Sequence, residues 1–183
     1  PVEAGELTDK HLNILSKLAD SCSVSDFESE SSFLSREFNF PSVSKLKLDA
    51  SMEKVLTQRF EEINLCLKSE AWLSVVLLVG SSLEGILLHV VVNNPRLFNS
   101  SKAAPTRDGK VKRHHLWTLA ELINATHCEG YISMNIKKFG HAVRDFRNFI
   151  HPNQQLNSGF NPDEYTAGIS WQVLCATISD LTS

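Results

Sequence analysis

The sequence predicts an all-α protein: an antiparallel bundle of four to five main helices, preceded by a short N-terminal helical appendage. Apolar residues recur every three or four positions through several long segments, and helix start and stop signals bound those segments. No run alternates apolar with polar residues as a half-buried strand does. With 183 residues, 42% of them hydrophobic, the chain can bury a core of its own.

Residues 1–45 differ in composition from the rest and are predicted to form a separate segment. The stretch ELTDKHLNILSKLA has helical spacing, and the Ser-rich, acidic DSCSVSDFESESS after it is typical of a solvated linker. The aromatic residues of SFLSREFNFP are expected to dock on the main body, which spans residues 46–183. The opening PVEAGEL has no pattern of a secretory leader, so we expect a cytoplasmic protein. The missing initial methionine suggests a trimmed chain or one piece of a longer protein.

The first two bundle helices are predicted between residues 46 and 92. The first is marked by an apolar stripe of Leu48, Met52, Val55, Leu56, Phe60, Ile63 and Leu67. Ser69 is the expected N-cap of the second, EAWLSVVLLVGSSLEGILLHVVV. The second is apolar enough to raise the question of a membrane span. Glu84 and His89 argue against a span, because ionisable groups are costly in a bilayer. We interpret it as the central buried helix, which another helix can approach closely at GSSLEG.

Three more helices are predicted after a loop with the sequence NNPRLFNSSKAAPTRDGKVKRHH. The first, HLWTLAELINAT, should turn Leu116, Leu119, Leu122 and Ile123 inward. The second follows Ser133 as its cap and runs through MNIKKFGHAVRDFRNFI until Pro152 stops it. The last has Asn161 as its cap and Pro162 at its first position.

The helix before Pro152 has two sharply different faces. At about 100° per residue, its core side holds Ile136, Phe139, Val143, Phe146 and Ile150, and its other side holds Lys137, His141, Arg144, Arg147, Asn148 and His151. Arg144 and His151 should stack two turns apart, with Arg147 and Asn148 between them, while Asp145 lies to one side. A solvated polar face is one interpretation. A phosphate site is the other, because arginine binds phosphate oxygens bidentately and histidine titrates near neutral pH.

The stretch VRDFRNFIHP resembles the motif of HEPN domains, an all-α family found in toxin–antitoxin, abortive-infection and CRISPR-associated systems. That motif places an arginine a few residues before a histidine, often with a polar residue after an arginine. Arg144 and His151 match this spacing, and Asn148 follows Arg147. The similarity extends through GSSLEG and LWTLAELI, over about residues 46–183.

The resemblance implies a metal-independent endoribonuclease that acts as a C2 homodimer, with the motif helices of two subunits facing across one cleft. His151 would act as general base on a ribose 2′-hydroxyl or as acid toward the 5′-oxygen. Arg144, with Arg147, would stabilise the phosphorane charge, and Asn148 would orient the phosphate. The expected setting is phage defence or a toxin system, with an antitoxin or defence-system partner. The alternative is a non-catalytic HEPN dimerisation or RNA-binding module of a larger defence protein.

Two features outside this helix are also singled out. Glu84 is a carboxylate in a nearly all-apolar helix, so we expect it to pair with Arg144 or Arg147, the alternative being another buried donor. The segment from Arg96 to Arg113 has six basic residues against Asp108 alone, in a chain of net charge −3. Its candidate RNA-backbone contacts are Arg107, Lys110, Lys112 and Arg113; a merely solvated basic loop is the alternative.

Other chemistry finds little support in the sequence. No phosphate-binding P-loop, HExxH or nucleophile-elbow pattern is present, and the four cysteines are scattered without a CxxC. We therefore expect neither a metal nor a cofactor.

Overall fold

The computed structural model describes residues 29, 32–33, 43–148 and 151–183. Within these residues the chain forms seven α-helices, two short 3₁₀ helices and one small hairpin, so the predicted all-α fold class is confirmed. The predicted N-terminal helix, and the predicted linker apart from Ser29 and Ser32, lie outside the described residues. Phe33 is described and docks as expected: it is 1% exposed, and its ring stacks on Phe139 with centroids 5.1 Å apart.

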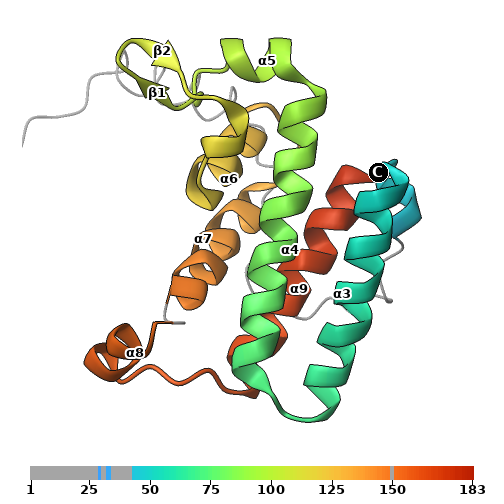
Figure 1. The fold of residues 1–183 in the computed structure, drawn as a ribbon, viewed down its shortest axis with the longest axis vertical. Helices are drawn as coiled ribbons and strands as arrows, with labels where there is room; N and C mark the ends of the chain where they lie inside the picture. Colours follow the sequence, from blue (N-terminus) through green and yellow to red (C-terminus); the bar gives the residue numbers. More distant parts are fainter. Residues whose placement is uncertain (1–28, 30–31, 34–42, 149–150) are drawn as a thin grey trace, which may run out of the picture.

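Five long helices make up the bundle: α3 (Ala50–Lys68), α4 (Trp72–Asn93), α6 (Leu119–Cys128), α7 (Met134–Asn148) and α9 (Glu164–Leu181). Helix α4 lies at the centre and packs against the other four (Figure 1). Among the described residues it is the one helix long and apolar enough to span a membrane. Its side chains at Val79, Leu83 and Leu87 are fully buried in the bundle. The prediction of a central buried helix is confirmed.

The turn between α3 and α4 corrects two predictions. Ser69 ends α3 instead of starting α4, since its backbone N–H and its hydroxyl both donate to the carbonyl of Leu65, at 3.0 and 2.9 Å. Helix α4 begins after Ala71, which makes no side-chain cap. Val55, placed in the apolar stripe, is 48% exposed. The stripe's buried part is Leu56, Phe60 and Ile63.

The segment predicted as a loop contains regular structure. Helix α5 (Pro95–Ser100) comes first, and strands β1 (Thr106–Arg107) and β2 (Lys110–Val111) then pair antiparallel. Asp108 and Gly109 join the strands with φ of 54° and 73°. Positive φ at both positions is what a tight two-residue hairpin requires, and Asp-Gly is the sequence that supplies it. The prediction of a loop was therefore wrong here.

Helix α6 begins later than the sequence suggested. Residues His114–Leu116 form a 3₁₀ turn, η3, and Thr118 is the N-cap in a reciprocal capping box with Glu121. Leu116 falls before this cap and is 57% exposed, so its predicted inward position is wrong. Leu119, Leu122 and Ile123 are buried as predicted.

The chain between α7 and α9 also differs from the prediction. Pro152 does not simply end a helix but opens α8 (Pro152–Ser158), at the position where its missing N–H is tolerated. Figure 1 shows α8 set apart from the bundle. The cap of α9 is Asp163, not Asn161, because the Asp163 carboxylate accepts from the Thr166 N–H at 2.8 Å.

Candidate functional site

Helix α7 presents the predicted polar face beside a buried one. Ile136, Gly140 and Val143 are buried against the bundle, whereas the polar residues Lys137, His141, Arg144, Arg147 and Asn148 remain partly or fully exposed. Helix α7 packs against α4, α6 and α9. The two edges of its polar face therefore lie close to these neighbouring helices. The periodicity of the sequence thus placed both faces correctly as far as Asn148.

Glu84 and Arg147 form an ion pair between α4 and α7, through Oε2 and Nη1. This confirms the predicted partnership of Glu84 with a motif arginine. The two side chains are 34% and 31% exposed, so water screens the pair only in part. Arg147 reaches Glu84 by crossing Gly80, one turn earlier on α4. A Cβ atom at Gly80 would lie 2.8 Å from Cδ of Arg147, so any other residue there would force the Arg147 stem to shift.

Arg144 belongs to a different set of contacts. Its Nε donates to Oδ1 of Asp145 at 2.9 Å, and its Nη1 lies 3.4 Å from Nδ1 of His141. Nε2 of His141 lies 3.1 Å from Oδ1 of Asn124 on α6. These two contacts fit a neutral imidazole with its proton on Nε2. Burial, together with the charges of Arg144 and Lys137, lowers the pKa of His141, which also favours the neutral ring. Sequence reasoning had not given Asp145 or Asn124 a role.

His151 lies beyond the end of α7. Its backbone is extended, with φ −77° and ψ 119°, and it is the N-cap of α8. Its carbonyl accepts from the Gln155 N–H at 3.0 Å, and its side chain is exposed, with no hydrogen bond or ion pair among the described residues. The predicted stacking of His151 two helical turns from Arg144 therefore stays a prediction. The intervening residues, 149 and 150, lie outside the described part of the chain.

A hollow of about 490 Å³ opens beside the ion pair. Its α4 and α7 side consists of Glu84, Arg144, Arg147 and Asn148, and residues 115–120 form the opposite side. Three of the four predicted motif residues thus border one concavity. His151 is not among the residues that line it. His115, to which the sequence analysis assigned no role, also lines it.

The wall formed by residues 115–120 is held by the α6 cap. The Glu121 carboxylate accepts from the Thr118 N–H at 2.7 Å and from the Lys112 ammonium at 2.8 Å. Burial alone would raise the pKa of Glu121, but Lys112 and the Thr118 bonds outweigh it and hold the pKa below its usual value. Lys112, predicted as an RNA contact, is thus engaged inside the fold.

The other predicted RNA contacts are on or beside the hairpin. Arg107 and Lys110 are exposed on the two strands, and Arg113 is exposed just before η3. The Nε of Arg107 lies 3.9 Å from Asp108, in a fully solvated pair of little strength. Three cations therefore remain available on this side of the molecule.

Searches for known proteins found no matching family model, no matching curated protein and no matching solved structure. In the described part of the chain, no cluster of three or more His, Cys, Asp or Glu side chains is arranged to hold a metal ion.

Proposed function

We propose that the chain is a HEPN-type, metal-independent endoribonuclease whose site is built around Arg144, Arg147, Asn148 and His151. One observation carries the proposal: two guanidinium groups and an amide border the same hollow, and a carboxylate on the central helix fixes one of the guanidinium groups. A phosphodiester has the shape and charge that such a set recognises.

The arginines keep donors for phosphate. A guanidinium has five N–H donors, and Glu84 takes up Nη1 of Arg147, which orients the rest of the group. Arg144 is held by Asp145, whose side chain is 53% exposed. A surface pair of this kind is worth about 0–1 kcal/mol, so a phosphate can replace it. Asn148, exposed at the end of α7, adds an amide donor.

In this mechanism His151 supplies proton transfer. As base it takes the proton of a ribose 2′-hydroxyl, whose oxygen attacks the adjacent phosphorus. The bond from phosphorus to the 5′-oxygen breaks, and the leaving oxygen is protonated in turn. The products are a 2′,3′-cyclic phosphate and a 5′-hydroxyl end. His151 lies outside the hollow of its own subunit, so we propose that a second copy brings the two motif faces together in a C2 dimer.

A second candidate is a non-catalytic RNA-binding or dimerisation module of a defence system. The observation that favours it is that both arginines already have carboxylate partners, while the His151 side chain has none among the described residues. Such a module would bind RNA through the same arginines and the exposed Arg107, Lys110 and Arg113, and would leave the strand intact.

The test is incubation of the protein with labelled single-stranded and structured RNA in EDTA. We compare wild type with His151→Ala and with Asn153→Ala, a neighbour on α8 that is also exposed. The proposal expects cleavage by wild type and Asn153→Ala, and a loss of about a hundredfold or more for His151→Ala. RNA binding without cleavage by any of the three proteins would favour the second candidate. Cleavage that persists in His151→Ala would contradict the mechanism.

A further inference from the structure

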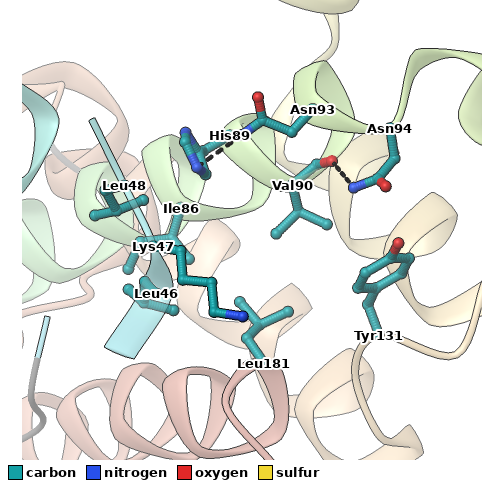
Figure 2. Close-up of a pocket in the computed structure, with 10 residues that line it drawn as sticks. All are labelled: Leu46, Lys47, Leu48, Ile86, His89, Val90, Asn93, Asn94, Tyr131 and Leu181. Carbon is teal, nitrogen blue, oxygen red and sulfur yellow. Dashed lines mark hydrogen bonds between the residues drawn. The ribbon is translucent and has the colours of Figure 1, made fainter. Parts of the chain in front are cut away.

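A second hollow, of about 280 Å³, lies at the C-terminal end of α4. Its apolar side is formed by aliphatic side chains from three helices and from the turn before α3, namely Leu46, Leu48, Ile86, Val90 and Leu181 (Figure 2). Its volume is at the small end of ligand pockets, which run from about 300 Å³ upward. The hollow therefore suits a small molecule with a hydrocarbon part and does not suit a polymer.

Lys47 is the one permanently charged side chain among the described residues that line this hollow. Its backbone φ is 51°, a left-handed conformation that costs a residue other than glycine roughly 1–2 kcal/mol. This turn joins the 3₁₀ helix η2 (Val43–Leu46) to α3, and Figure 2 shows the Lys47 side chain extending across the hollow toward Leu181. Its ammonium makes no ion pair or hydrogen bond with any described residue.

The remaining polar groups at the rim are mostly used within the protein. The amide nitrogen of Asn93 lies 2.7 Å from Nε2 of His89, and the Asn94 amide donates to the Val90 carbonyl at 2.9 Å. Lys47 therefore sets the electrostatic character of the hollow.

We propose that this hollow binds a small amphipathic carboxylate, such as a medium-chain fatty acid. The hydrocarbon chain would lie against the aliphatic side chains, and the carboxylate would meet the Lys47 ammonium. Burial of the chain supplies affinity in proportion to its apolar surface. The single cation selects a negative head group over a neutral or positive one. The inference does not rest on the proposed RNA chemistry.

The first test compares ligands that differ in one property at a time, by titration calorimetry on the wild-type chain. Hexanoate and octanoate vary the chain, and each added methylene should tighten binding by about fourfold. Octanol and octylammonium keep the eight-carbon chain and change the head group. Octanoate should bind about tenfold more tightly than octanol, and octylammonium more weakly than either. Equal binding of all three head groups would overturn the proposal, as would no detectable binding of octanoate.

The second test uses variants with matched controls. Lys47→Met should remove the preference for octanoate over octanol while octanol still binds, which shows that the hollow is intact. Lys45→Met, an exposed lysine two residues earlier that does not line the hollow, should keep the preference. Val90→Trp should fill the hollow and abolish binding, whereas Val92→Trp, at a 50% exposed position on the same helix, should not. A preference that survives Lys47→Met, or binding that survives Val90→Trp, would refute the assignment.

Discussion

The two ends of the motif are held in different ways. Arg147 is fixed from two directions, since Gly80 makes room for its stem and Glu84 binds its guanidinium. His151 follows the end of α7 in an extended conformation, is exposed, and leads into α8, which stands apart from the bundle. The arginine end is thus part of the monomer's packing, and the histidine end is not.

This difference bears on how a site could be completed. The arginine end of the motif is already oriented, so binding a phosphate there costs little side-chain conformational entropy. An exposed imidazole gains its catalytic position only when something else covers it. A second copy of the chain, or the RNA itself, is the covering group that the proposed function supplies.

The largest contrast expected is in stability, between α7 and α8. Ile136 on α7 is 1% exposed and Leu156 on α8 is 80% exposed. Ile136→Ala should lower the free energy of unfolding by about 2–5 kcal/mol, and Leu156→Ala should change it by less than about 0.5 kcal/mol. Urea denaturation of the two variants measures both. A large loss for Leu156→Ala would show that α8 packs on the bundle or on a second copy.

Removing the charge of Glu84 should have the next largest effect. Glu84→Gln leaves the Arg147 guanidinium without its carboxylate, which we expect to cost about 1–2 kcal/mol of unfolding free energy. It should also slow RNA cleavage, because Arg147 loses its orientation. Glu62→Gln, at an exposed position on α3, is the matched control and should change neither quantity. If Glu84→Gln leaves both stability and cleavage unchanged, Glu84 has no positioning role.

Alanine substitutions at two glycines of α4, Gly80 and Gly85, should differ in their effect on stability by a smaller amount. Alanine in a helix interior is favoured over glycine by about 0.8–1 kcal/mol. Gly85 has open space where its Cβ would be, so Gly85→Ala should stabilise the protein by about that amount. Gly80→Ala should lose this gain, because its Cβ would meet the Arg147 stem at 2.8 Å. Thermal unfolding of the two variants tests this, and equal stabilisation by both would mean that Arg147 does not cross Gly80.

The smallest effect expected is a dependence on pH through His141. Its pKa is lowered in the folded protein, so the unfolded chain binds more protons below its ordinary pKa of about 6.5. The stability contribution is present above that pH and is lost as the pH falls below it. His141→Gln should reduce the loss of stability between pH 7.5 and 5.5, measured by urea denaturation. An unchanged slope in the variant would contradict the shift assigned to His141.

Sequence periodicity predicted much of the fold, and the reason is visible in α4 and α7. Both helices are long, so many apolar positions repeat the same phase and the buried face is well determined. Boundaries were less certain, because neighbouring residues compete as caps. A serine hydroxyl such as that of Ser69 can accept from an N–H in the first turn of a helix or donate to a carbonyl in the last turn, and here it does the second. Asp163, and not Asn161, is the cap of α9 because its carboxylate accepts from the Thr166 N–H.

The candidate site was predictable where it depends on helix phase or on the cost of burying a charge. The pairing of Glu84 with a motif arginine followed from the cost of a lone carboxylate in an apolar helix. Two features did not follow. The position of His151 depends on where α7 ends, and the path of Arg147 over Gly80 depends on how two helices cross. The Asp-Gly pair at the hairpin, by contrast, was a readable signal that the loop prediction overlooked.

The terminal groups of the RNA fragments report on the proposed mechanism. Wild-type protein is incubated with RNA in EDTA, and the fragments are analysed by mass spectrometry for their terminal groups. Attack by a 2′-hydroxyl, with His151 moving the protons, predicts 2′,3′-cyclic phosphates paired with 5′-hydroxyl ends, and their absence in His151→Ala. Fragments with 3′-hydroxyl and 5′-phosphate ends, or intact RNA in every sample, would contradict the account.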